Sequence, residues 1–275
     1  MLEALLAFGF GLLIGSFLNV CVYRLPRDLS VVRPRSYCPA CEKQIAWYDN
    51  IPVLSYILLG GHCRYCKTRI SARYPVVELM TGALFFIYAL RMGPTLAAVK
   101  YCVLGALLTG LLFSDLEERI LPDEFTLGGT LLGLGFAFLI PVQDFAAHML
   151  LWVLKIDLNQ RIVSFLEALI GAVLPAFVLW LGGYLYEKLR KREGMGFGDV
   201  KMLLMVGSFL GFRDTILTMV IGSVLGSIVG YLFIRFTQKE ISTYELPFGT
   251  FLAVGGIAVT LLGPTVFEWY SAVGR

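Results

Sequence analysis

Apolar stretches of about twenty residues recur from one end of this 275-residue chain to the other. A helix needs about 20 such residues to cross the hydrocarbon core of a bilayer. Hydrophobic residues make up 57% of the chain and charged residues 16%, and the charged share lies well below the roughly 25% that is usual for soluble domains. The sequence therefore predicts an all-α polytopic membrane protein.

Eight segments of the chain are candidate transmembrane helices. They cover residues 2–23, 75–91, 97–114, 125–141, 165–187, 200–212, 215–235 and 248–270. The sixth segment is too short to cross the membrane upright, so it is either tilted or begins in a water-filled cleft, and the count is seven or eight. The first segment lacks a basic region before it and a small-residue exit after it, so we expect it to remain as a span rather than to be a cleaved signal peptide.

The lysines and arginines orient these segments. In an eight-span arrangement 17 of the 23 fall on one side, nine of them within residues 24–74 and five between Lys188 and Lys201. The side rich in Lys and Arg is normally cytoplasmic, so both termini are expected to face outward. We expect lipid around the spans and no nucleic-acid partner.

Four of the six cysteines form two C-x-x-C pairs, Cys38 with Cys41 and Cys63 with Cys66, separated by 21 residues. This spacing is typical of a zinc site with four thiolate ligands. A reducing cytoplasm disfavours disulfides, although redox-active or unpaired thiols remain an alternative. Four thiolates leave no open position on the metal, so the predicted Zn²⁺ is structural, and His62 is expected to be a surface residue.

The chain is thus expected to have three parts. Residues 1–23 form the first transmembrane helix, residues 24–74 a cytoplasmic zinc-binding module, and residues 75–275 the remaining transmembrane domain. A module of about 50 residues has only a small hydrophobic core, and such modules usually need a cross-link such as a bound metal to be stable.

Two aspartates lie at the ends of apolar segments. Asp199 follows the glycine-rich stretch that begins at Gly194, and Asp115 ends the third segment, where a helix C-terminus disfavours negative charge. Each has a structural alternative: Asp199 as a helix N-cap and Asp115 as the partner of Arg119. Both are predicted at the cytoplasmic edge of the membrane, where ionisable groups are functional candidates.

Two carboxylates that share a site can act on one water as general acid and general base. We therefore predict that Asp115 and Asp199 form a peptide-hydrolysing pair. Gly196 and Gly198 would let an extended substrate backbone lie close to the acid. Asp123 is the nearest competitor of Asp115, but its place in the first turn of the next helix accounts for it.

Several motifs follow one another along the chain: Gly15-Ser16-Phe17-Leu18-Asn19-Val20, Tyr23-Arg24-Leu25-Pro26, the two C-x-x-C pairs, Asn50-Ile51-Pro52, Arg73-Tyr74-Pro75 through Glu78-Leu79, Asp115, and Gly194 to Lys201. Their order resembles that of the type IV prepilin peptidases, which are bifunctional leader peptidases and N-methyltransferases of bacterial inner membranes in the GxGD class of aspartyl proteases. The resemblance covers nearly the whole chain.

The resemblance implies a multi-pass protein of the bacterial inner membrane whose active site faces the cytoplasm. It assigns catalysis to Asp115 and Asp199 and zinc to the four cysteines, and it makes residues 75–275 the peptidase domain. The implied substrate is a prepilin or pseudopilin precursor of a pilus or secretion system, cut after a glycine that ends a short basic leader. The implied second reaction is methylation of the new amino terminus with S-adenosylmethionine.

The residues themselves do not reveal a site for the methyl donor. We place it between the zinc module and the first span, with Asn19, Arg24 and Glu78 as candidates. The connection over residues 142–164 is longer than the resemblance predicts.

Three other functions compete with this interpretation. A preprotein peptidase without methyl transfer is the nearest. A transporter or proton relay could use the two acids, but they are predicted on one side of the membrane and no inverted repeat is visible. A scaffold whose zinc module binds a partner would leave the glycine-rich stretch unexplained.

Overall fold

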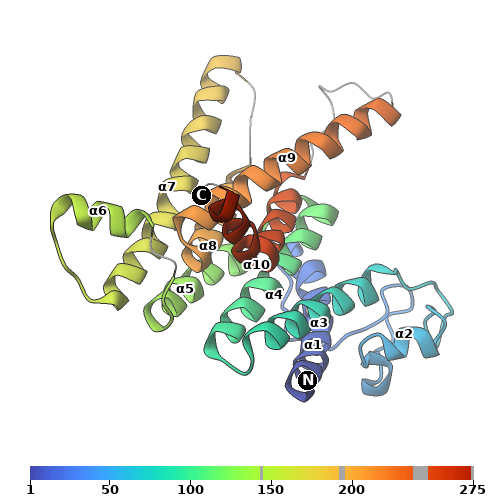
Figure 1. Ribbon diagram of the computed structural model, residues 1–275. Helices are drawn as coiled ribbons and strands as arrows, with labels where there is room; N and C mark the ends of the chain where they lie inside the picture. The colour runs from blue at the N-terminus through green and yellow to red at the C-terminus, as the bar shows by residue number, and fades with distance from the viewer. Residues whose placement is uncertain (143–144, 192–195, 238–246, 274–275) are drawn as a thin grey trace. The chain divides into compact units, whose positions relative to one another are not determined.

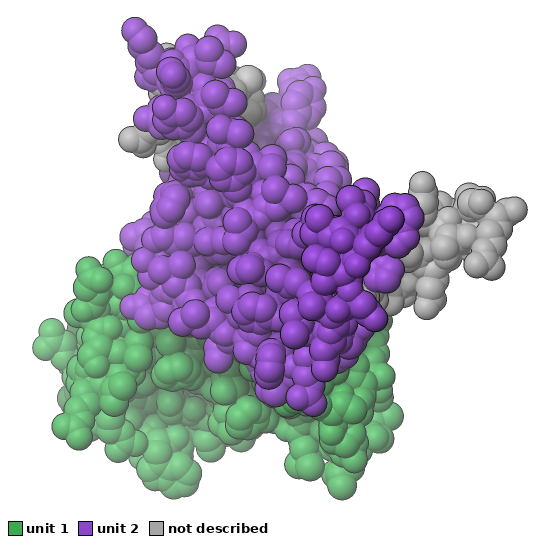
Figure 2. Space-filling view, turned by 90° about the vertical axis from the view of Figure 1, so that its left-hand side faces the viewer, with its two compact units in different colours: residues 1–114 green, residues 115–275 purple. Residues whose placement is uncertain are grey.

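The computed structural model describes residues 1–142, 145–191, 196–237 and 247–273, and the regular secondary structure in this part is helical. Within these residues there is no β-strand, and the only bridges are two isolated ones, Tyr37 with Gln44 and His62 with Arg69. The predicted all-α class is confirmed. The chain divides into two compact units, residues 1–114 and 115–275 (Figure 2), which are described separately below.

The first unit contains two long helices that pack on each other. It also contains most of a third helix. They are α1 (Leu2–Arg24), α3 (Arg73–Met92) and α4 (Leu96–Glu118), whose last residues belong to the second unit (Figure 1). The module between α1 and α3 holds two short 3₁₀ turns, Leu25–Arg27 and Trp47–Asn50, and the one-turn helix α2 (Leu54–Leu58). α1 and α3 form the most extensive helix pair in this unit.

The second unit is organised around α8. Its helices are α5 (Asp123–Leu139), α6 (Ala146–Leu154), α7 (Gln160–Arg190), α8 (Phe197–Leu210), α9 (Phe212–Thr237) and α10 (Phe248–Val273). α8 packs against α5, α7, α9 and α10. Met202, Leu203, Met205, Val206 and Phe209 are fully buried, as expected for a helix that is apolar on all sides.

All eight predicted segments are helices, but they differ in length. Within the described residues, five helices are long and apolar enough to cross a membrane: Leu2–Arg27, Arg73–Met92, Leu96–Glu118, Gln160–Arg190 and Phe212–Phe233. α8 has 14 residues and is about 21 Å long, short of the roughly 30 Å hydrocarbon core. The chain is a multi-pass membrane protein in which α8 is covered by other helices.

Glycines set the distance between α1 and α3. A Cβ atom on Gly15 would lie 2.6 Å from the Cα of Glu78, and one on Gly11 would lie 2.8 Å from the Cα of Gly82. Lipid is as apolar as a leucine side chain, so membrane helices gain stability from close backbone packing more than from the hydrophobic effect. The Gly11-x-x-x-Gly15 spacing puts both small residues on one face of α1.

The contact between α7 and α8 is also made by glycines. A Cβ atom on Gly207 would overlap the carbonyl oxygen of Gly171, and one on Gly171 would overlap the backbone of Gly211. Because α8 begins two residues before Asp199, this contact fixes the helix that carries the second predicted catalytic acid.

A buried carboxylate on α7 links this helix to the starts of two others in the second unit. Glu167 of α7 is fully buried. Its Oε2 accepts hydrogen bonds from the N–H groups of Phe145 and Ala147 at the start of α6, and its Oε1 accepts one from Phe212 at the start of α9. The long connection after α5 is therefore held to α7 by hydrogen bonds to one side chain.

We predict that Gly207→Ala destabilises the protein, because the added methyl group has no space against Gly171. Overpacking of this kind costs roughly 1–3 kcal/mol, which would lower the thermal unfolding midpoint of the detergent-solubilised protein. Gly182→Ala in α7 is the matched control, because a Cβ atom there meets nothing within 4 Å. Equal midpoints for the two variants would contradict the packing argument.

Candidate active site and metal centre

Four acidic residues are buried in the described part of the chain: Glu78, Asp115, Glu167 and Asp199. A carboxylate taken out of water needs hydrogen-bond donors or a counter-charge. Glu78 and Glu167 accept hydrogen bonds from backbone N–H groups at the starts of helices, which gives both a structural role. The two predicted catalytic acids differ from each other in this respect.

Asp115 is bound by the start of α10. Its Oδ2 accepts a 2.6 Å hydrogen bond from the N–H of Thr250 and a 2.9 Å hydrogen bond from the Thr250 hydroxyl. The positive end of a helix dipole stabilises an anion at this place. The unfavourable C-terminal position of Asp115 on α4 is thus compensated by the N-terminus of another helix, which lies 135 residues further along the chain.

Asp199 has no comparable donor. The N-cap of α8 is Gly196, and Asp199 is the third residue of the helix, so its alternative role as the N-cap is wrong. Its backbone N–H bonds to the Gly196 carbonyl, while its carboxylate accepts no hydrogen bond from another described residue. It is the one buried acid in the described ranges that lacks such a donor.

The two carboxylates lie near each other in the second unit. Asp115 and Asp199 interact electrostatically. Leu121 lies next to the glycine before Asp199 and next to Gly249 at the start of α10. A Cβ atom on Gly198 would lie 3.2 Å from the Cβ of Leu121. A Cβ atom on Gly249 would lie 3.0 Å from the Cδ1 of Leu121 and 3.1 Å from the Oδ2 of Asp115. The backbones beside both acids therefore contact the same leucine.

The predicted glycines have different surroundings. A Cβ atom on Gly196 would lie 3.7 Å from Oδ2 of Asp199, so this residue keeps space open next to the carboxylate. Gly198 instead makes room for Leu121. Their use by a substrate backbone stays a prediction, and Gly194 and Met195 of the same stretch lie outside the described residues.

Asp123 is engaged elsewhere. Both of its carboxylate oxygens accept hydrogen bonds from the Lys201 ammonium group, at 2.7 and 2.9 Å, and its side chain is 55% exposed. This ion pair ties the start of α5 to α8 and leaves Asp115 as the acid that interacts with Asp199.

The four cysteine sulfurs form one cluster in the first unit. All lie within 4.8 Å of one another, and the Sγ atoms of Cys38 and Cys66 are 3.7 Å apart. Tetrahedral coordination with Zn–S bonds of about 2.3 Å places the sulfurs about 3.8 Å apart, whereas a disulfide requires about 2.05 Å. All four thiols are free, so the arrangement fits a metal ion and not disulfides.

Two similar turns present these sulfurs. The N–H of Cys38 bonds to Lys43 O and that of Cys63 to Thr68 O, so each C-x-x-C pair sits in a tight hairpin. Glu42 and Lys67, each four residues after the first cysteine of its pair, have positive φ angles of 56° and 58°. The two C-x-x-C turns therefore share the same backbone geometry.

Charge in the cluster is unevenly distributed. The Thr68 hydroxyl, 3.3 Å from the Cys66 sulfur, lowers the pKa of Cys66 to about 6, and the N–H groups of Cys66 and Tyr65 lower the pKa of Cys63. At Cys41 the Lys43 N–H acts in the same direction, but desolvation and the other three thiols outweigh it and raise the pKa to about 11. All four sulfurs can be thiolates together only when a cation offsets their charge.

His62 is not part of this cluster. Its ring nitrogen Nδ1 lies 2.6 Å from the Gly60 carbonyl oxygen, and the residue is exposed. The metal-ligating set is the four cysteines alone within the described residues.

The three residues proposed for the methyl donor all lie in the first unit but play different parts. The Asn19 amide donates to the carbonyl oxygens of Gly15 and Tyr74 and so joins α1 to α3. Arg24 is buried at the end of α1, and Glu78 accepts a 2.7 Å hydrogen bond from the N–H of Val53.

Sequence reasoning missed Thr250. The Gly249-Thr250 pair at the start of the last apolar segment marks a helix beginning, but nothing in the sequence indicates which distant acid it binds.

Two family models match the chain. The Bacterial Peptidase A24 N-terminal domain matches residues 10–92, and the Type IV leader peptidase family matches residues 102–231. No solved structure matches.

Several curated relatives carry the name prepilin leader peptidase/N-methyltransferase. The protein from Aeromonas hydrophila is 33% identical over 96% of this chain and 92% of its own length, and that from Pseudomonas putida is 34% identical over 94% and 90%. The protein from Myxococcus xanthus is 39% identical over 86% of this chain, which spans 65% of that relative's length. This chain therefore belongs to the type IV leader peptidase family.

Proposed function

We propose that this chain cleaves the leader from type IV prepilin or pseudopilin precursors and methylates the amino group that cleavage exposes. The observation that carries the peptidase half is the interacting pair of buried carboxylates, of which Asp115 is hydrogen-bonded to Thr250 and Asp199 is not. The names of the relatives support both activities.

The two acids differ in their hydrogen bonds, and this difference supports one position for the proton that they share. Two adjacent carboxylates do not both ionise readily, so they share one proton. Two hydrogen bonds from Thr250 and the α10 dipole favour the anion at Asp115. Asp199, without a donor, therefore holds the proton.

Peptide hydrolysis follows from this assignment. Asp115 removes a proton from a water molecule while the water oxygen bonds to the scissile carbonyl carbon, and Asp199 donates its proton to the carbonyl oxygen. Asp115 then passes the proton that it gained to the leaving nitrogen as the C–N bond breaks. Asp199 recovers a proton from the carbon-bound hydroxyl as the carbonyl group re-forms, which restores the starting state.

The location follows from the charge distribution. We place the protein in the bacterial inner membrane, as the family resemblance implies. Both acids and the zinc module lie on the cytoplasmic side in this proposal, because 17 of the 23 lysines and arginines fall on their side in an eight-span arrangement. A precursor whose basic leader precedes an apolar helix would present its cleavage point at this interface.

The two cofactors have separate roles in this proposal. Zn²⁺ held by the four cysteines would cross-link the two C-x-x-C turns of the module between α1 and α3, which is too small to bury much core of its own. S-adenosylmethionine supplies the methyl group for the second reaction.

We predict that Asp115→Asn and Asp199→Asn each lower kcat/KM for precursor cleavage roughly a thousandfold or more, as expected for residues that act as one unit. The assay separates cleaved from uncleaved precursor by mass in detergent. Glu124→Gln, an exposed acid at the start of α5, is the control and should cleave at the unsubstituted rate. Cleavage that survives Asp115→Asn but not Asp123→Asn would assign the first acid to Asp123 instead.

We predict that Thr250→Val lowers kcat roughly tenfold with little change in KM, because it removes one hydrogen bond to the Asp115 carboxylate but keeps the backbone N–H. Thr250→Ser keeps the hydroxyl and should restore the rate. Equal rates for the valine and serine variants would show that the hydroxyl does not position Asp115.

We predict about one zinc ion per chain by metal analysis. Cys63→Ser should lose the metal and become sensitive to protease within residues 24–74. Cys102→Ser, which removes a thiol outside the cluster, should retain both the metal and the resistance. A metal-free protein with undiminished protease resistance would refute the cross-linking role.

A further inference from the structure

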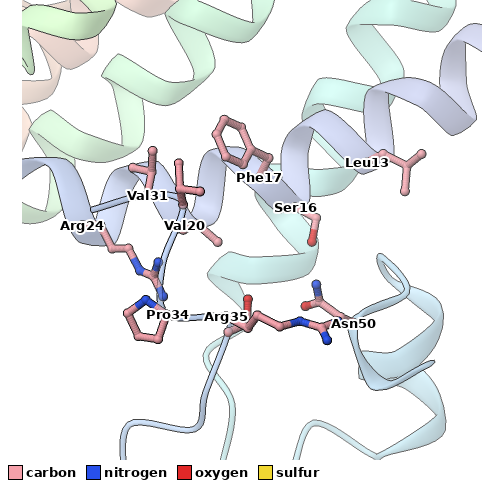
Figure 3. A pocket seen from close by; sticks show the side chains of 11 residues that line it. Leu13, Ser16, Phe17, Val20, Arg24, Val31, Pro34, Arg35 and Asn50 are labelled. Carbon is pink, nitrogen blue, oxygen red and sulfur yellow. The ribbon is translucent and has the colours of Figure 1, made fainter. Parts of the chain in front are cut away.

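The first unit contains a cavity of about 300 Å³ between α1 and the segment that follows it. One wall is a stripe of α1 from Leu13 to Arg24, the other is formed by residues from Val31 to Ser36, and Asn50 closes one side (Figure 3). The volume is at the lower end of the range for small-molecule sites. None of its lining residues is a zinc ligand or one of the two aspartates.

The wall on α1 has an ordered composition. Its five lining residues follow the i, i+3, i+4, i+7, i+11 spacing of one helix face: Leu13, Ser16, Phe17, Val20 and Arg24. Phe17 and Val20 form an apolar centre, flanked by a hydroxyl on one side and a guanidinium on the other. The two polar residues, Ser16 and Arg24, are about 12 Å apart along the helix axis.

Arg24 makes one end of the cavity positive. It is 6% exposed, and its NH1 donates a 2.9 Å hydrogen bond to the Ser30 carbonyl oxygen, an uncharged acceptor. Among the residues that the structure describes, no acidic side chain pairs with it. A buried guanidinium without a counter-charge is costly, so an anionic group at this position would stabilise it.

Arg35 adds a second positive charge to the same cavity. It is an exposed residue on the opposite wall, and its side chain extends toward Asn50 (Figure 3). Arginine's planar set of donors suits carboxylates, so Arg24 and Arg35 together favour a ligand with a carboxylate group.

Glu78 lies behind the other polar residue. The Ser16 hydroxyl that lines the cavity is hydrogen-bonded to the buried Glu78 carboxylate, and the second donor to Glu78 is the N–H of Val53. Both donors are uncharged. An acidic side chain therefore lies close to the end of the cavity opposite Arg24, and its carboxylate oxygens favour a cationic group there.

We propose that this cavity binds S-adenosylmethionine, with Arg24 and Arg35 holding its carboxylate, the Glu78 side facing its positively charged groups, and Phe17 and Val20 contacting its adenine ring. This proposal rests on the methyl-transfer half of the proposed function. A ligand with charges of both signs and an apolar ring matches all three features of the cavity. An anionic phospholipid headgroup matches the arginines but gains nothing from Glu78.

Direct binding tests this assignment. Purified protein in detergent is titrated with radiolabelled S-adenosylmethionine, and bound label is measured by equilibrium dialysis. Arg24→Gln, Arg35→Gln and Glu78→Gln should each weaken binding roughly tenfold or more, the size expected for losing a charged partner. Zinc content and the elution volume of each variant establish that it is folded.

Arg33→Gln is the matched control. Arg33 is an exposed arginine of the same segment that does not line the cavity, so this variant loses the same charge without touching the proposed contacts. It should bind the methyl donor as the unsubstituted protein does. A loss of affinity equal to that of Arg35→Gln would reduce the effect to net charge and overturn the proposal.

The remaining outcomes separate this inference from the proposed function. If the unsubstituted protein methylates and binds the donor but Arg24→Gln and Arg35→Gln bind it unchanged, the cavity is not the site. If those two variants instead lose a co-purified anionic phospholipid while Glu78→Gln keeps it, the cavity is a lipid site and the proposal fails. If the unsubstituted protein neither binds the donor nor methylates cleaved precursor, the methyl-transfer function itself is wrong.

Discussion

Three of the four buried carboxylates in the described residues are stabilised by backbone N–H groups at helix starts. Glu78 accepts from Val53 just before α2, Asp115 from Thr250 in the first turn of α10, and Glu167 from residues at the starts of α6 and α9. A helix start has unpaired donors and a positive dipole, so each bond satisfies both partners away from water. These bonds fix the position of helices that are far apart in the sequence.

Asp199 departs from this pattern, and in the proposed mechanism this difference gives the two acids different roles. An acid with two donors and an acid with none have different affinities for a shared proton, which is what a general base and a general acid require. Thr250 creates that difference at Asp115. The other candidate for the first acid, Asp123, forms an ion pair with Lys201 instead of interacting with Asp199.

Close packing through glycine keeps these groups in place in both units. Gly171 and Gly207 let α7 and α8 touch through their backbones, and Gly11 and Gly15 do the same for α1 against α3. The first contact holds the helix that carries Asp199. The second contact holds Glu78 against the part of α1 that lines the cavity. Close glycine packing thus supports both the aspartate pair and the proposed ligand cavity.

The sequence by itself determined the features that depend on neighbours along the chain. The apolar segments predicted eight helices that the structure contains. The C-x-x-C spacing identified the four cysteines whose sulfurs form one cluster. Only the tertiary structure decided that Asp115 meets Thr250, that Asp123 pairs with Lys201, and that Arg24 borders a cavity. The reason is physical: local patterns set helices and turns, whereas the donor that a buried charge finds depends on how helices distant in sequence pack.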